Sequence, residues 1–95
     1  MKIGTLRARN REILEIASRH GARNVRVFGS VIHGEAGPGS DIDLLVDVDP
    51  DHTPWFPAGL VADLEALLGQ PVDVVTEEAL HWYIRQRVLA EAVPL

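Results

Sequence analysis

The amino-acid sequence predicts an α/β (α+β) fold: a small mixed β-sheet with helices mainly on one face. Segments with apolar residues three and four positions apart alternate along the chain with short β-branched runs. The composition, 46% hydrophobic and 24% charged, is that of an ordinary globular protein. Because 95 residues build one modest core, we expect a single domain over residues 1–95.

The first part of the chain predicts a helix, a strand and a turn. Thr5 and Gly21 are the candidate caps of a helix over about residues 6–20. Its buried face is expected to consist of Leu6, Ile13, Leu14 and Ala17. A strand over about residues 24–28 follows, and then a turn at Gly29-Ser30 that begins a short helix. The Gly- and Pro-rich stretch 34–40 is expected to be a loop.

A second strand is expected over about residues 41–48, where apolar and acidic residues alternate. The buried face is expected to hold Ile42, Leu44, Val46 and Val48. The other face is expected to hold Asp41, Asp43, Leu45 and Asp47. Residues 49–57, with three prolines and two aromatics, predict an irregular loop.

The rest of the chain predicts a helix, a strand and a last helix. The first of these helices covers about residues 60–68 and ends at Gly69. A short strand over about 72–76 follows, and Thr76 is the candidate cap of the last helix, which Pro94 ends. The expected buried stripe of that helix is Leu80, Ile84, Val88 and Leu89. The remaining large aromatics are expected in the core or at an interface, and they are Trp55, Phe56, Trp82 and Tyr83.

Composition and charge exclude several classes of function. No apolar run approaches the ~20 residues of a membrane span, and the N-terminus lacks the apolar core of a signal peptide. We therefore expect a cytoplasmic protein that does not associate with a membrane. There is no cysteine, so the metal ligands available favour hard cations such as Mg²⁺. Residues 27–95 hold two Lys/Arg and twelve Asp/Glu, and such an acidic surface does not match a nucleic-acid template.

Two carboxylates and a glycine turn form the candidate site. Asp41 and Asp43 are spaced i, i+2 on a strand, so they project on one face roughly 6–7 Å apart. Their repulsion is relieved by a divalent cation. The Gly29-Ser30 turn presents backbone N–H groups and a hydroxyl to an anion. Each feature alone is weak evidence, but together, with a lone acid in a later strand, they indicate metal-assisted phosphoryl or nucleotidyl transfer.

The full pattern resembles the signature of the DNA polymerase β-like nucleotidyltransferase superfamily. It reads Gly29-Ser30-x-x-x-Gly34-x-x-x-x-x-Ser40-Asp41-x-Asp43-Leu44-Leu45-Val46. Within the superfamily the short chain is similar, over about residues 10–92, to the minimal nucleotidyltransferases, which are the antitoxin partners of HEPN-domain toxins. The resemblance implies a polymerase β-like core and one minimal nucleotidyltransferase domain.

The resemblance also implies roles for individual residues. Asp41 and Asp43 would bind two Mg²⁺ ions that carry ATP, and Asp73 would be the third, proton-accepting acid of the triad. Gly29 and Ser30 would hold the β- and γ-phosphates. The reaction would transfer AMP to a hydroxyl, by family analogy a tyrosine, of the HEPN-domain toxin.

One position departs from the family pattern. Members commonly carry arginine before the second glycine, where this chain has His33 before Gly34. A neutral histidine makes no bidentate phosphate contact, so either nucleotide binding is weaker, or the partner supplies a cation, or position 33 simply faces solvent. Two alternatives therefore stay open: an antitoxin that acts by binding alone, and a small-molecule nucleotidyltransferase whose acceptor site comes from another chain.

Overall fold

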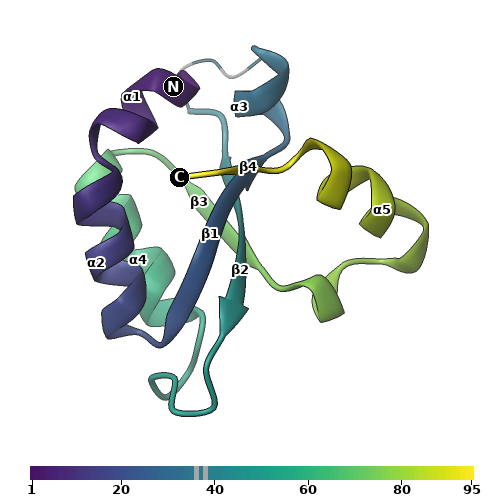
Figure 1. The fold of residues 1–95 in the computed structure, drawn as a ribbon. Helices are drawn as coiled ribbons and strands as arrows, with labels where there is room; N and C mark the ends of the chain where they lie inside the picture. The colour runs from purple at the N-terminus through teal and green to yellow at the C-terminus, as the bar shows by residue number, and fades with distance from the viewer. Residues whose placement is uncertain (36, 38) are drawn as a thin grey trace.

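The sheet has mixed direction, as the sequence predicts, and it has four strands. The computed structural model describes residues 1–35, 37 and 39–95, so only part of the predicted loop at 34–40 lies within the described residues. The strands are β1 (Ala22–Phe28), β2 (Ile42–Val48), β3 (Val72–Val75) and β4 (Val93–Pro94). They lie in the order β3-β2-β1-β4 (Figure 1). β1 is antiparallel to β2 and β4, and β2 is parallel to β3.

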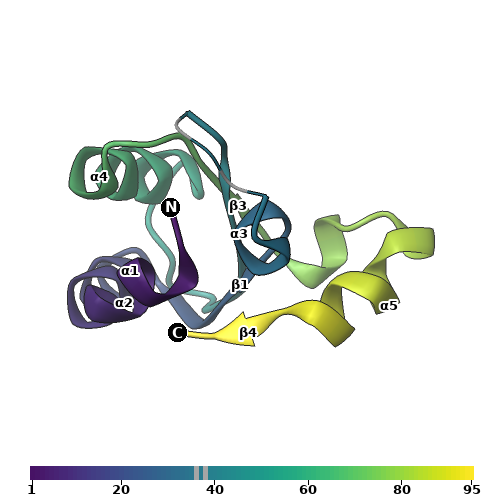
Figure 2. The same cartoon turned by 90° about the horizontal axis from the view of Figure 1, so that it is seen from above.

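Most of the helical residues lie on one side of this sheet, which confirms the predicted arrangement. Figure 2 shows α1, α2 and α4 together on one side and α5 on the other. The helices are α1 (Ile3–Ala8), α2 (Asn10–Arg19), α3 (Ser30–His33), α4 (Ala58–Leu68) and α5 (Trp82–Glu91). A 3₁₀ turn, η1 (Glu77–Ala79), precedes α5.

The main core lies between the sheet and α1, α2 and α4. Alternate residues of β2 enter it, and Ile42, Leu44 and Val46 are almost fully buried there, as predicted. The helices contribute residues at helical spacing, and these are Leu6, Ile13, Ala17, Leu60, Leu64 and Leu68. This burial orients β2, since its even-numbered residues face the helices and its odd-numbered residues face away.

The opposite face of the sheet is also partly covered, which the sequence analysis did not predict. Leu45 was expected to share an open face with the aspartates, but it is fully buried in a second cluster with Leu80 and Val88. α5 packs over this part of the face because an exposed leucine in the middle of a sheet gains free energy when it is covered. The aspartates therefore lie beside a small apolar cluster.

The N-terminal helix differs from the prediction. The expected helix over 6–20 is two helices, separated at Arg9, and Thr5 lies inside α1 and does not cap it. At the break, the Arg9 guanidinium donates to the carbonyl of Leu67, and the Asn10 amide donates to the carbonyl of Leu95. Both bonds join segments far apart in the sequence, so no local pattern indicates them. Gly21 adopts the left-handed conformation after α2, as expected of a C-terminal cap.

The C-terminal segment is divided as well. Thr76 makes no side-chain cap, the η1 turn ends before Leu80, and α5 begins only at Trp82. Pro94 does follow the helix, but it lies in β4, a two-residue strand that the sequence analysis missed. Two residues are too few to show the alternation that identifies a strand. Among the described residues, no helix is both long and apolar enough to cross a membrane.

Two leucines whose burial differs from the prediction in opposite directions test the cluster of Leu45, Leu80 and Val88. Leu45 is fully buried, whereas Leu14, which was predicted to be buried, is 38% exposed. We expect Leu45→Ala to lower the free energy of unfolding by about 2–5 kcal/mol, through lost burial and a cavity. Leu14→Ala should change it by less than about 1 kcal/mol. Urea unfolding of both variants measures the difference, and equal effects would contradict the burial of Leu45 beneath α5.

Candidate active site

The three predicted acids come to neighbouring positions on two adjacent strands. Asp41 is exposed one residue before β2, Asp43 is half-buried within β2, and Asp73 is exposed on β3. The parallel register pairs Asp43 directly with Asp73. Since paired strands lie about 4.8 Å apart, the two carboxylates leave the sheet side by side. Both point away from the main core, because Ile42 and Leu44 point into it.

These acids disfavour one another's charge. The pKa of Asp43 is raised, first because the carboxyl is partly buried and then because Asp73 and Asp41 lie nearby. A bound cation would relieve both repulsions, and carboxylate oxygens are the ligands that Mg²⁺ prefers. Among the residues the structure describes, however, no three His, Cys, Asp or Glu side chains converge closely enough to hold a metal ion. The three aspartates therefore suit a divalent cation in donor type and charge, but they do not form a closed coordination shell.

The glycine turn lies against Asp43. Gly29 follows β1 with φ +75° and ψ −143°, a conformation that side-chain-bearing residues rarely adopt. A Cβ atom at this position would collide with Oδ2 of Asp43. Phe28, the residue before the turn, is the β-ladder partner of Asp43. The sequence pair Gly29-Ser30 therefore lies next to the aspartate pair.

Ser30 starts α3 and connects this turn to the second strand. Its hydroxyl donates to the backbone carbonyl of Asp41 over 3.4 Å. Gly34 adopts the left-handed conformation that ends α3. The second glycine of the sequence pattern therefore has a structural reason, which is to turn the chain sharply out of a four-residue helix.

Glu91 is a site residue that sequence analysis missed. At the end of α5, its Oε1 accepts a hydrogen bond from the backbone N–H of Gly29 over 3.3 Å. Its Oε2 lies 2.9 Å from Nε2 of His33. His33 is therefore half-exposed, and it is paired with Glu91. A positively charged side chain at position 33 would have this carboxylate as a partner even if it does not contact phosphate. The spacing of 62 residues between Gly29 and Glu91 left no local signal.

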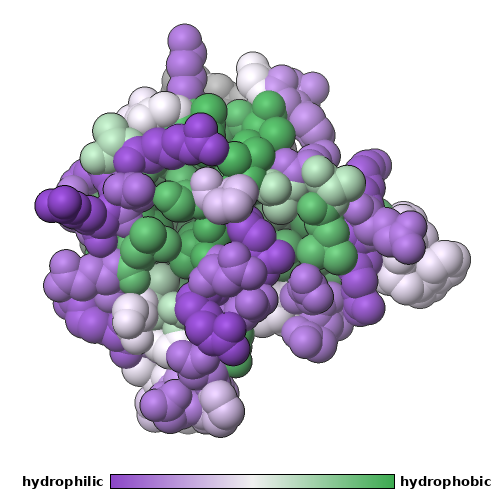
Figure 3. Space-filling view, in the orientation of Figure 1, coloured by the Kyte–Doolittle hydropathy of each residue, from purple (hydrophilic) through white to green (hydrophobic). Residues whose placement is uncertain are grey.

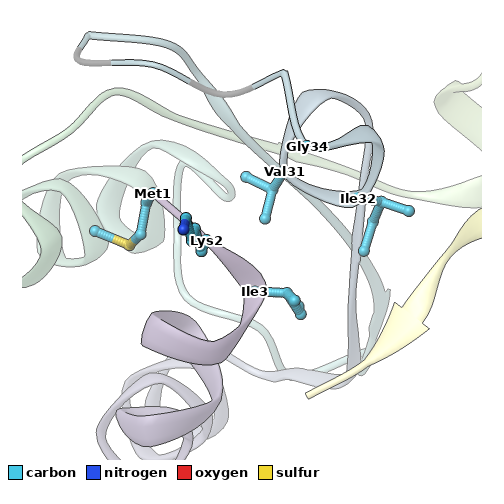
Figure 4. Close-up of a pocket in the computed structure, with 6 residues that line it drawn as sticks. All are labelled: Met1, Lys2, Ile3, Val31, Ile32 and Gly34. Atoms are coloured by element: carbon cyan, nitrogen blue, oxygen red, sulfur yellow. The ribbon is translucent and has the colours of Figure 1, made fainter.

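An apolar cavity lies between α1 and α3, away from the three aspartates. It has a volume of about 300 Å³ and is lined by Met1, Lys2, Ile3, Val31, Ile32 and Gly34 (Figure 4). It contains no carboxylate. The acids thus lie outside this cavity, on the sheet face next to α5.

The raised pKa of Asp43 predicts how stability depends on pH. A carboxyl whose folded pKa lies above its unfolded value of 3.8 stabilises the fold below that value, and this contribution is lost as pH rises through the folded pKa. Asp43→Asn should therefore be at least as stable as the native chain at pH 7, and it should lose less stability between pH 4 and pH 7. Urea unfolding at both pH values tests this. Asp51→Asn, on an exposed loop, is the matched control, and an Asp43→Asn variant less stable at pH 7 would contradict the electrostatic argument.

Comparisons with known proteins agree with this arrangement. The nucleotidyltransferase domain model matches residues 10–95. A protein of Thermococcus cleftensis named protein adenylyltransferase MntA is 42% identical over 79 residues, which are 83% of this chain and 80% of that protein. The Methanocaldococcus jannaschii protein MJ0435, named as a candidate protein adenylyltransferase, is 36% identical over 87% of this chain and 89% of its own length.

Solved structures show the same fold. The structure of a candidate minimal nucleotidyltransferase is 49% identical and has a TM-score of 0.84, over 100% of this chain and 97% of that one. A toxin–antitoxin structure with AMP-PNP has a TM-score of 0.73 over 88% of this chain and 69% of that one, and at 21% identity it supports the fold alone. The family match, the relatives and the acid-and-glycine site together show that this chain belongs to the nucleotidyltransferase domain family, as a minimal nucleotidyltransferase.

Proposed function

We propose that this chain is a cytoplasmic, Mg²⁺-dependent enzyme that transfers AMP from ATP to a hydroxyl of a HEPN-domain toxin and so neutralises the toxin. The observation that carries the proposal is the juxtaposition of Asp43, Asp73 and the Gly29 turn. The relatives named protein adenylyltransferase support the reaction. The similar fold of a MntA–HepT toxin–antitoxin complex supports the kind of partner.

Each predicted site residue has a role in this proposal. Asp41, Asp43 and Asp73 would hold two Mg²⁺ ions, which when bound neutralise the phosphate charge and the charge that develops in the transition state. Gly29 and Ser30 would hold the β- and γ-phosphates through their backbone N–H groups and the hydroxyl. Asp73, which is more exposed than its ladder partner Asp43, would take the proton of the acceptor hydroxyl.

The proposed reaction is an in-line displacement at phosphorus. The deprotonated acceptor oxygen bonds to the α-phosphorus of ATP, and the bond from that phosphorus to the bridging oxygen breaks. Pyrophosphate leaves with this oxygen, and the acceptor retains AMP. The chain itself contributes positioning and a proton acceptor, which suits a reaction that requires little covalent chemistry from the protein.

The open position of the acids supports a macromolecular acceptor. The cavity beside α3 and a second one of about 430 Å³ beside α5 contain none of the three aspartates. Asp41 and Asp73 are exposed and Asp43 is half-buried, so a segment of another protein can approach the acids from solvent. We propose a tyrosine as the acceptor residue, by analogy with the family.

A second candidate function is an antitoxin that acts by contact alone. The observation that favours it is His33, which replaces the arginine common in the family and pairs with Glu91. In that case the site would be vestigial and the chain would inhibit the toxin by covering it.

Asp43→Asn distinguishes the two candidates. Because the substitution removes a charged ligand without changing the size of the side chain, we expect transfer of labelled AMP to the toxin to fall at least about 100-fold. Binding to the toxin should persist. Two measurements are needed: incorporation of label from ATP in the presence and absence of EDTA, and protection of cells that express the HEPN-domain toxin.

The two outcomes are distinct. Loss of protection together with incorporation would establish catalysis as the means of neutralisation. Full protection by an Asp43→Asn variant that incorporates no label would refute the enzymatic role. The matched Asp51→Asn variant should behave as the native chain in both assays.

Glu91 provides a further test of where the phosphates lie. Its carboxylate accepts from the Gly29 N–H, at the position proposed for the phosphates. Glu91→Gln keeps an acceptor there but removes a negative charge, so ATP should bind up to about tenfold more tightly. Glu78→Gln, an exposed glutamate in η1, should leave binding unchanged. Calorimetry with ATP measures both, and an unchanged affinity of Glu91→Gln would place the phosphates elsewhere.

A further inference from the structure

The start of α5 carries an exposed aromatic cluster. Trp82 is 78% exposed and Tyr83 is 67% exposed. Their rings lie against each other and against His81, with centroids 5.9 Å apart for Trp82–Tyr83 and 4.3 Å for His81–Tyr83. The three rings thus form a surface whose parts support one another but are not packed into the core. Aromatic side chains held in this way lose little entropy when a partner covers them.

This cluster borders a hollow on the surface. A cavity of about 430 Å³ is lined by Trp82, Tyr83, Arg85 and Gln86. In Figures 1 and 2 the start of α5 projects away from the sheet. Figure 3 shows a pale surface at this projecting edge, apart from the green hydrophobic surface over the middle of the molecule. Within α5, only Val88 is fully buried, so most of the helix surface remains available.

The same helix carries an unusual charge. Arg85 and Arg87 are the two basic residues of segment 27–95, which otherwise holds twelve acids. Arg85 is three positions after Trp82, and Arg87 is four positions after Tyr83, so each arginine neighbours an aromatic ring on the helix surface. Among the described residues neither arginine has a carboxylate within ion-pair distance, and the buried Nε of Arg85 has no hydrogen-bond acceptor. In the described part of the chain, the aromatic cluster therefore has two cations beside it that no ion pair neutralises.

We propose that the start of α5 is the surface that docks the partner protein, and that the partner offers an apolar groove flanked by carboxylates. Trp, Tyr and Arg are the residues that most often carry binding energy at interfaces. The carboxylates would pair with the two arginines, which supplies the charge complementarity. This inference rests on the proposed function for the identity of the partner, which is the HEPN-domain toxin.

Two other occupants fit the surface less well. In a symmetric dimer the same patch faces itself, so the arginines of both copies would meet and repel one another. A nucleic acid would need more than two cations to offset the repulsion of the surrounding acids. A partner protein with carboxylates avoids both difficulties.

The position of α5 also suits the proposed transfer. The helix starts at the aromatic cluster and ends at Glu91, which contacts Gly29. At 1.5 Å per residue, Trp82 lies about 14 Å along the helix from Glu91. An extended segment of about five residues spans that length. A partner docked at the aromatic cluster can therefore deliver a hydroxyl to the aspartates without entering a pocket.

Two exposed substitutions test the surface, with a matched tryptophan as control. Trp82→Ala and Arg87→Glu should each weaken binding of the toxin at least about tenfold, measured by calorimetry with the full-length chain. Trp55→Ala is the control, because Trp55 is 88% exposed but lies in the loop after β2. It should bind the toxin as the native chain does. All variants should bind ATP with unchanged affinity, which verifies that the site is intact.

The outcomes separate this inference from the proposed function. Native affinity of both Trp82→Ala and Arg87→Glu would overturn the docking surface, even if transfer of AMP is observed. Weakened binding by these two variants would support it, even if the native chain transfers no AMP. A native dimer that Trp82→Ala dissociates in sedimentation, with no effect on toxin binding, would assign the surface to a second copy and overturn the inference.

Discussion

The site depends on a parallel pairing between β2 and β3 that brings two carboxylates together. Asp43 and Asp73 occupy one level of the ladder, and the pKa of Asp43 is raised, first by partial burial of its carboxyl and then by repulsion from Asp73 and Asp41. Such repulsion is tolerated because the alternate residues of β2 are buried against three helices, and their burial outweighs it. The negative charge of the neighbouring aspartates can then attract a cation. A hydrophobic core on one face of the sheet thus maintains an electrostatic strain on the other.

The close approach of Gly29 to Asp43 adds a second constraint. β1 delivers the chain to the aspartate at a point where a Cβ would meet the Asp43 carboxylate and displace it. Glycine is required there for its positive φ, and it leaves the carboxylate in place. Consequently, the turn that offers backbone N–H groups is adjacent to the acids that suit a metal ion. In the proposed reaction, the polyphosphate and the metal ions of one nucleotide need this adjacency, and the fold supplies it with two short strands.

Alternation and turn chemistry made part of this structure predictable. The burial of Ile42, Leu44 and Val46, and the turn at Gly29, follow from local patterns. Three features that sequence analysis missed arise from contacts between distant segments. Leu45 lies on the face predicted to be open, but α5 covers it. The helix break at Arg9 coincides with hydrogen bonds to the carbonyls of Leu67 and Leu95. Glu91 contacts Gly29 at the end of the chain that β4 pairs with β1. One-dimensional periodicity holds no information on such contacts.

α5 is the element in which these separate features meet. Val88 anchors it on Leu45, in the strand that carries the acids, and Glu91 fixes its end on the Gly29 turn. Its other end presents Trp82 and Tyr83 to solvent. A rigid helix held at both the acid-bearing strand and the glycine turn transmits the position of whatever docks on its free end. In the proposed complex, the length of one helix would set the distance between the docked protein and the nucleotide. Accurate placement of two reactants is the main contribution a small protein can make to phosphoryl transfer.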